Sequence, residues 1–264
     1  MTQSVIELKK TGSTAIVTLC RPEKLNALSA DLRDAMLETF ASVQSDDAIR
    51  AVVVTGAGRG FCSGADLTTP APQPPPPTQD DLLDDLGWVG RQAISVYRLN
   101  KPVIAAVNGV AAGAGMSLAL ACDVRVGSEL SRFKTVFIER NLSPDSGMSF
   151  FLPRIVGYSR AADLIYTSRM VDAEEAYRIG LLDRLVDADT LLETAVEVGE
   201  QMAAWPPLAL RMSKRVLQHN TECDLEDALR FEYTSLTFGN KAVNDRKESI
   251  AAFRERRTPV YTGT

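Results

Sequence analysis

Continuous apolar runs alternate with amphipathic stretches along the first half of the chain. The runs 51–55 (AVVVT) and 102–107 (PVIAAV) predict strands that are buried on both faces. A further short strand is predicted over 123–126. Apolar residues at helical spacing predict three helices: 29–43 with Ser29 as its cap, 82–99 and 113–121. Strand, helix and strand in this order indicate parallel pairing through right-handed crossovers.

The two ends of the chain have different patterns. Alternating residues over 5–8 and 15–19 predict a hairpin at the start. From Asp189 onward all predicted elements are helices: 190–203, 206–219, 224–237 and 241–254. Because a Trp-Pro-Pro break precedes the last three, we predict a core domain over 1–204 and a helical module over 205–264.

The segment 68–80 interrupts these patterns with six prolines in thirteen residues. Proline lacks a backbone donor and disfavours both helix interiors and central strands. We therefore expect an extended, mobile surface loop there, without helix or strand.

Composition narrows the class of protein. The chain has 264 residues, a net charge of −5 and 45% hydrophobic residues, which indicates an ordinary globular protein and argues against a nucleic-acid binder. The four cysteines form no CxxC pair, and no leader or long apolar span is evident, so we expect a cytoplasmic protein without a membrane segment. A single histidine, His219, excludes a zinc site built from several histidines.

Two glycine-rich turns follow the apolar strands. The first, 55–66 (TGAGRGFCSGAD), lacks the G-x-G-x-x-G spacing of a dinucleotide site, and no Walker motif occurs. The second, 108–117 (NGVAAGAGMS), opens a helix. Small residues here suit tight packing of helix on strand; alternatively, both turns aim backbone N–H groups at one point, where they stabilise the oxygen of a thioester.

Four ordered motifs resemble the enoyl-CoA hydratase/isomerase (crotonase) family. They are RPEKLNAL (21–28), GFCSGADL (60–67), NGVAAGAG…ACD (108–123) and AAFRER (251–256). The resemblance implies an α/β fold, a crotonase-like spiral of ββα units with a C-terminal helical module that forms homotrimers or dimers of trimers. It also implies an acyl-CoA thioester substrate, with coenzyme A as part of the substrate, and neither metal nor redox cofactor.

The resemblance assigns roles to individual residues. The backbone amides of Ala65 and Ala114 are the expected oxyanion donors. Further residues are expected to bind the substrate or to support its loop: Lys24, Leu25 and Ala27 at a strand end, Asp66 and Leu67, and from a neighbouring subunit Phe253 and Arg256. The basic C-terminal tail fits this last expectation, because coenzyme A carries phosphates.

The active-site acids depart from the family pattern. Ser117 and Phe137 stand where hydratases carry two glutamates, and both are expected to line the substrate. Hydration of a double bond needs groups that activate water and supply a proton, which serine and phenylalanine do not provide together. An alignment shift of two would place Glu139 at the second position, although a surface ion pair is the simpler role for it.

Asp145, in LSPDSGMSF (142–150), stands where isomerases of the family carry an aspartate. One carboxylate is enough to remove a proton beside a thioester and return it elsewhere. The alternative is that Asp145 caps a helix. Three hypotheses follow: an isomerase that uses Asp145, an enoyl-CoA hydratase, and a non-catalytic acyl-CoA binder. Asp123 is expected to fix a turn.

Overall fold

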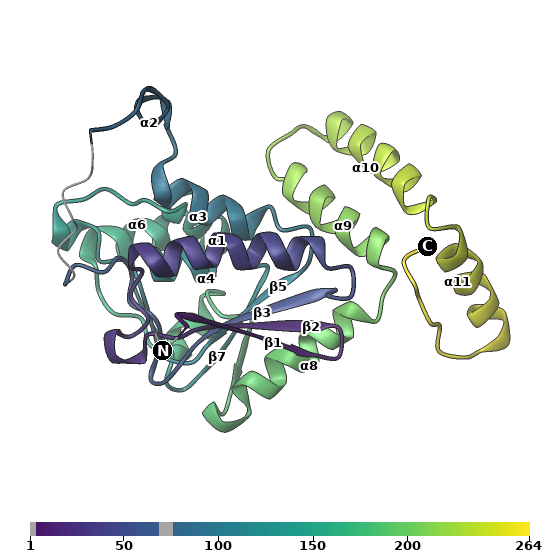
Figure 1. Ribbon diagram of the computed structural model, residues 1–264, viewed down its shortest axis with the longest axis horizontal. Coiled ribbons are helices and arrows are strands. Elements are labelled where there is room, and N and C mark those ends of the chain that lie inside the picture. The colour runs from purple at the N-terminus through teal and green to yellow at the C-terminus, as the bar shows by residue number, and fades with distance from the viewer. Residues whose placement is uncertain (1–3, 69–75) are drawn as a thin grey trace.

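A computed structural model describes residues 4–68 and 76–264. A six-stranded sheet has the order β1-β2-β3-β5-β7-β9, and a three-stranded sheet has the order β4-β6-β8. The strands of the large sheet are β1 (Ile6–Thr11), β2 (Thr14–Leu19), β3 (Ala51–Gly56), β5 (Val103–Val107), β7 (Val124–Ser128) and β9 (Arg184–Val186). Those of the small sheet are β4 (Gly60–Cys62), β6 (Val110–Ala112) and β8 (Arg132–Lys134). The predicted α/β class is confirmed, with a helical C-terminal region (Figure 1).

Helices cover both faces of the large sheet. Those of the core are α1 (Ala30–Ser45), α2 (Gln79–Leu83), α3 (Gly87–Tyr97), α4 (Ala114–Ala121), α5 (Met148–Val156), α6 (Tyr158–Thr167), α7 (Ala173–Arg178) and α8 (Leu191–Ala203). Single turns of 3-10 helix lie at Pro22–Lys24, Ile138–Arg140 and Ala188–Thr190. The last three helices are α9 (Pro207–His219), α10 (Leu225–Gly239) and α11 (Val243–Glu255), close to the predicted ranges, and Figure 1 shows α11 at the far side of the molecule from α2 and α6.

The apolar run of β3 matches the burial of both faces of the large sheet under helices. Val52 and Val54 point into one core, which includes residues of α1 and α4, whereas Val53 points into a second core under α8. β3 pairs in parallel with β2 on one side and with β5 on the other. A strand with both faces and both edges covered has to be apolar throughout, as the sequence indicated.

The expectation for 68–80 is wrong at its end. Thr78 and Asp81 form a reciprocal capping box that begins α2 at Gln79, so the last residues of the segment are helical. Residues 69–75 lie outside the described part of the chain. The helix predicted over 82–99 is also divided. α2 ends at Leu83, and α3 begins at Gly87, whose N–H donates to the Asp84 side chain.

In the part of the chain that the structure describes, no helix is long and apolar enough to cross a membrane.

An ion pair between buried Lys214 and partly exposed Asp123 connects α9 to the sheet. The Lys214 ammonium, on a residue that is only 7% exposed, lies 2.7 Å from the Asp123 carboxylate and donates also to the carbonyl of Lys101. Asp123 in turn accepts the N–H of Val103 at the start of β5. Asp123 therefore connects the turn before β7 to β5 and to α9, which is the structural role that the sequence suggested.

We expect Lys214→Met to lower the free energy of unfolding by about 2–3 kcal/mol, because it leaves the partly buried Asp123 carboxylate without its cation. The matched control is Arg230→Met, which removes an exposed pair with Glu226 and Asp227 and changes stability by less than about 0.5 kcal/mol. Urea unfolding followed by circular dichroism measures both. Equal losses in the two variants would contradict this account of the Lys214 pair.

Candidate active site

The segment 24–28 and the turn 63–66 run side by side. The N–H of Ser63 donates to Leu25 (3.0 Å), that of Leu28 to Gly64 (2.8 Å), and that of Asp66 back to Leu28 (3.3 Å). In a parallel pairing of this kind, the residue between two bonded groups directs its own N–H toward the opposite edge. The N–H of Ala65 therefore faces away from the segment 24–28, on an exposed residue.

The second donor lies at the start of α4. The N–H of Ser117 bonds to Gly113, so the N–H groups of the first three helical residues have no intrahelical partner. Ala114 is the first of these. A helix N-terminus favours negative charge on whatever accepts these donors.

Glycines allow the two turns that carry Ala65 and Ala114 to approach each other closely. Gly64 has a φ of +94°, and a Cβ added to it would lie 2.8 Å from the carbonyl oxygen of Ala112 and 3.5 Å from the nitrogen of Ala114. A Cβ on Gly115 would lie 2.0 Å from the carbonyl oxygen of Cys62. The tight packing expected of these turns is therefore confirmed, whereas the aim of both N–H groups at one point stays a prediction. No described atom accepts a hydrogen bond from the N–H of Ala65 or Ala114.

Two asparagines fix the glycine-rich turn, and sequence reasoning missed their role. Asn26 is fully buried, and its side-chain amide donates to the carbonyls of Ala57 and Gly60. Asn108 donates to Gly58 and accepts from the N–H of Gly56. The available signal was the residue type. A side-chain amide of asparagine can donate to the carbonyls of a turn and accept from one of its N–H groups at the same time.

Asp66 supports the loop that carries Ala65. Its carboxylate lies 2.8 Å from the Arg21 guanidinium and is 3% exposed. It also accepts from the backbone and side chain of Thr68. Arg21 donates further to the carbonyl of Ala27. This inward-facing pair anchors the start of the segment 24–28 to the loop.

The predicted strand end at 24–27 is wrong. Lys24 closes a turn of 3-10 helix, and Leu25 and Asn26 have left-handed φ values of 49° and 56°. The turn leaves Lys24 exposed and Ala27 buried at 7%. Leu67, further along the partner loop, is 70% exposed. Both exposed side chains flank the loop that bears Ala65.

Asp145 does not cap a helix. α5 begins at Met148 with Gly147 as its N-cap, and no side chain caps it. The Asp145 carboxylate accepts instead from the Ser146 hydroxyl (2.9 Å). Partial burial raises the pKa of Asp145, and the Ser146 hydrogen bond opposes this rise. A half-buried carboxylate with a raised pKa is suited to accept and return a proton.

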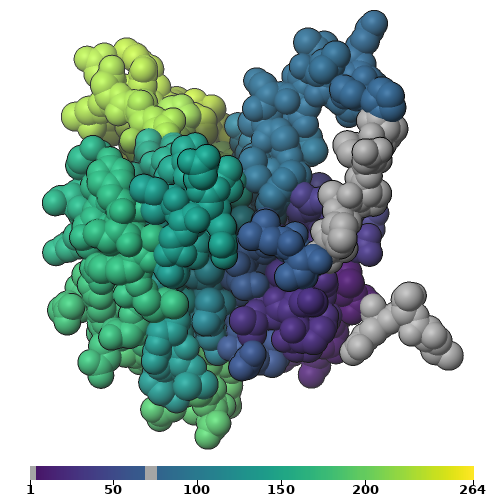
Figure 2. Space-filling model, turned by 90° about the vertical axis from the view of Figure 1, so that its left-hand side faces the viewer, coloured from purple at the N-terminus to yellow at the C-terminus, as the bar shows by residue number. Residues whose placement is uncertain are grey.

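Ser117 connects Asp145 to the helix of Ala114. Its hydroxyl donates to the backbone carbonyl of Asp145 at 3.3 Å, and the residue is 1% exposed. The turn that holds the carboxylate therefore lies against α4, one helical turn beyond the free amide of Ala114. On the face in Figure 2, the purple-to-blue early segments meet the teal middle of the chain.

The remaining predicted residues have different surroundings. Phe137 is 5% exposed and belongs to the main core. Glu139 forms an ion pair with Lys134 (2.7 Å), which lowers the pKa of Glu139. Phe253, 86% exposed, and Arg256 lie on or just after α11, away from the core of this chain (Figure 1). Among the described residues, no group of three or more His, Cys, Asp or Glu side chains is arranged to hold a metal ion.

Comparison with known proteins identifies relatives over nearly the whole chain. The family model described as enoyl-CoA hydratase/isomerase matches residues 9–264. The short-chain-enoyl-CoA hydratase of Clostridium acetobutylicum is 35% identical, with 95% of this chain and 94% of the relative covered. The 1,2-epoxyphenylacetyl-CoA isomerase of Escherichia coli is 34% identical, with 94% of both chains covered.

Solved structures agree with these relatives. A probable enoyl-CoA hydratase/isomerase from Mycobacterium abscessus superposes with a TM-score of 0.90 at 36% identity, covering 99% of this chain and 100% of the other. An enoyl-CoA hydratase from Bacillus anthracis gives a TM-score of 0.89 at 32% identity, covering 98% and 100%. The predicted crotonase-type fold is therefore confirmed.

We expect Gly64→Ala to be about 1–3 kcal/mol less stable than Gly87→Ala, because its methyl group overlaps the Ala112 carbonyl. Gly87 is the matched control: its φ is also positive, at +58°, but a Cβ there meets nothing within 4 Å. Both variants place alanine at a positive φ, but only the methyl group at position 64 collides with another turn. Urea unfolding of both compares them, and equal stability would show that the turns are not in close contact.

Proposed function

The chain belongs to the enoyl-CoA hydratase/isomerase family, and we propose that it is an acyl-CoA isomerase that uses Asp145 as its single catalytic carboxylate. The observation that carries this proposal is the position of Asp145. Its turn is hydrogen-bonded to α4, the helix whose first amide is a free donor, and its carboxylate takes no part in capping α5.

The two amides provide the oxyanion site in this proposal. The N–H groups of Ala65 and Ala114 bind the thioester carbonyl oxygen of the substrate. They bind it more strongly as negative charge develops on that oxygen, with each donor contributing roughly 3–4 kcal/mol. Backbone donors are already fixed by Gly64 and by the start of α4, so little reorganisation accompanies the reaction.

Asp145 transfers the proton. Its carboxylate removes a proton from the α-carbon next to the thioester carbonyl. The electron pair of that C–H bond forms a C=C bond, and the π electrons of the carbonyl move onto its oxygen to give the enolate. The carboxylic acid then returns the same proton to another carbon of the conjugated system, and the double bond has moved. Because the pKa of Asp145 is raised, its carboxylate takes up the substrate proton more readily than an ordinary aspartate would.

The presence of only one available carboxylate among the candidate residues favours isomerisation over hydration. Ser117 donates its hydroxyl to a backbone carbonyl, and Phe137 is in the core, so neither supplies a second acid at the site. Glu139 is engaged by Lys134. Addition of water needs a group for the water and a source for the α-proton, whereas a double-bond shift needs only one group. One relative, from Escherichia coli, is itself named an isomerase.

The coenzyme A portion is proposed to bind along the exposed edge of the 24–28 segment. Lys24 and Leu67 are exposed beside the Ala65 loop, and Leu25 and Ala27 shape the turn between them. Phe253 and Arg256 lie too far along the chain's own helical module for this site, and we propose that they reach the coenzyme A of a neighbouring subunit.

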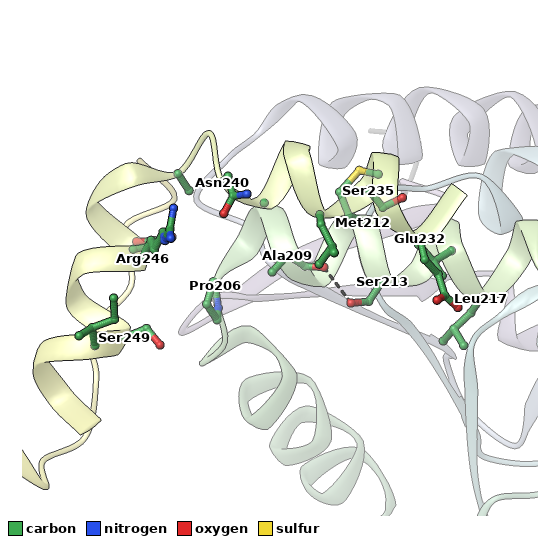
Figure 3. A pocket seen from close by; sticks show the side chains of 16 residues that line it. Pro206, Ala209, Met212, Ser213, Leu217, Glu232, Ser235, Asn240, Arg246 and Ser249 are labelled. Atoms are coloured by element: carbon green, nitrogen blue, oxygen red, sulfur yellow. Dashed lines mark hydrogen bonds between the residues drawn. The ribbon is translucent and has the colours of Figure 1, made fainter. Parts of the chain in front are cut away.

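The helical module is proposed to form the subunit interface of a homotrimer or dimer of trimers. A groove of about 760 Å³ lies between α9, α10 and α11 (Figure 3). Large apolar side chains of these helices are exposed, including Leu217 (71%), Tyr233 (73%) and Leu236 (66%). Such a surface is typical of an interface and costly in an isolated chain.

We expect Asp145→Asn to lower turnover of 3-enoyl-CoA to 2-enoyl-CoA esters by roughly 10²–10⁴-fold, while acyl-CoA affinity stays nearly unchanged. Asparagine keeps the shape but accepts no proton at this position. Glu139→Gln is the control and retains wild-type turnover. Absorbance of the conjugated thioester follows turnover, and calorimetry measures affinity.

Three results would contradict this assignment. Full turnover by Asp145→Asn would remove Asp145 from the mechanism. Efficient hydration of crotonyl-CoA by the wild type would favour a hydratase, and binding of acyl-CoA esters without any turnover would favour a binder.

For the assembly, light scattering after size exclusion is expected to give three or six times the 28.7 kDa of one chain. Leu236→Asp places a charge in the exposed apolar surface of α10 and is expected to yield smaller species. Leu82 of α2 is about as exposed as Leu236 but lies outside the helical module, so Leu82→Asp is the control that keeps the assembly. A monomeric wild type, or an unchanged Leu236→Asp, would contradict the proposed interface.

A further inference from the structure

Gln92 is a buried polar residue whose side chain the proposed reaction does not use. It lies on α3, is 3% exposed, and its Oε1 has no hydrogen-bond partner in the described part of the chain. Buried polar atoms are nearly always paired, so an unpaired one requires an explanation. In an enzyme, a ligand that supplies the missing partner is one such explanation.

α3 connects the two halves of the proposed site. Near its start, the Trp88 ring packs 4.4 Å from the guanidinium carbon of Arg33 on α1, the helix that follows the segment paired with Ala65. At its end, Tyr97 packs against Phe150 and Phe151 in the first turn of α5, which follows Asp145. Gln92 stands between these two contacts, one turn after Trp88.

The buried side of α3 faces the helix that bears the second donor. Gln92 and Val96 are one turn apart and are both buried. Val96 belongs to the core cluster that also holds Ala114 and Met116 of α4. The side chain of Gln92 is therefore on the buried side of α3, the helix that packs against α1 and α4, and not toward solvent.

We propose that Gln92 is a specificity-determining residue of the acyl site, and that its amide accepts a hydrogen bond from a hydroxyl group on the acyl chain. This inference rests on the proposed function and names its substrate class: acyl-CoA esters with an oxygenated acyl group. The aromatic side chains of Tyr97, Phe150 and Phe151, which pack against one another where the end of α3 meets α5, supply apolar surface. A purely hydrocarbon acyl chain would leave Oε1 unpaired.

The chemistry of the amide makes the preference one of hydrogen bonding and not of size. A glutamine offers an acceptor oxygen and two N–H donors at similar positions. A site that is built to pair with a substrate hydroxyl discriminates strongly against the analogue that lacks it, because the polar group of the protein then stays unpaired. Methionine has a similar length and no amide, so it removes the pairing and keeps the volume.

The test compares binding of matched CoA esters: hexanoyl-CoA with its monohydroxy derivatives, and phenylacetyl-CoA with its ring-hydroxylated derivatives. Calorimetry gives the dissociation constants for the wild type, Gln92→Met and the control Gln44→Met. Gln44 accepts a hydrogen bond from the N–H of Asn100 at the far end of α1, so the control removes a paired amide elsewhere. Thermal unfolding shows that each variant is folded.

We expect the wild type to bind at least one hydroxylated ester about tenfold or more tightly than its parent, and Gln92→Met to abolish that preference. Gln44→Met keeps it. A wild type without any preference, or a preference that persists in Gln92→Met, overturns the proposal while the isomerase function stands. If the wild type binds no ester at all, the proposed function itself fails, and this inference with it.

Discussion

The close approach of two backbone turns is the constraint on which the site depends. A Cβ on Gly64 would collide with the carbonyl oxygen of Ala112 and touch the nitrogen of Ala114, and a Cβ on Gly115 would lie still closer to the carbonyl oxygen of Cys62. Two short parallel strands, β4 and β6, pair beside these turns, with a register shift between Gly60 and Cys62. Because the donors belong to the backbone, their positions are set by strand pairing and the start of α4, not by side-chain rotamers.

The rest of the fold supports this arrangement and adds one acid. The large sheet, covered on both faces, carries β3 and β5 to the edge where both turns emerge. Ser117 then attaches the Asp145 turn to the same helix that presents Ala114. Partial burial raises the pKa of that carboxylate, which suits a group that both takes and returns a proton. Together these parts support the proposed isomerase activity.

The sequence predicted the elements that have a clear apolar pattern. The runs around Val53 and Ile104 were sufficient for the buried strands, and Ser29 marked the start of α1. β4, β6 and β8 have three residues each, too few for any periodicity, so the sheet that forms the site could not be predicted from pattern. The capping box of Thr78 and Asp81 was missed because it directly follows a run of prolines, which indicated a loop. The roles of Asn26 and Asn108 depend on hydrogen bonds between distant segments, and the burial of Gln92 depends on the packing of α3, neither of which one sequence reveals.

A crystal structure of the complex with a saturated acyl-CoA ester, which has no double bond to move, would show whether the two amides and Asp145 act on one substrate. We expect the nitrogens of Ala65 and Ala114 both to lie within about 3.1 Å of one thioester oxygen. We also expect a carboxylate oxygen of Asp145 about 3–3.5 Å from a carbon adjacent to the thioester or further along the acyl chain. A thioester oxygen that contacts neither amide, or an Asp145 side chain directed away from the acyl group, would contradict the proposed site.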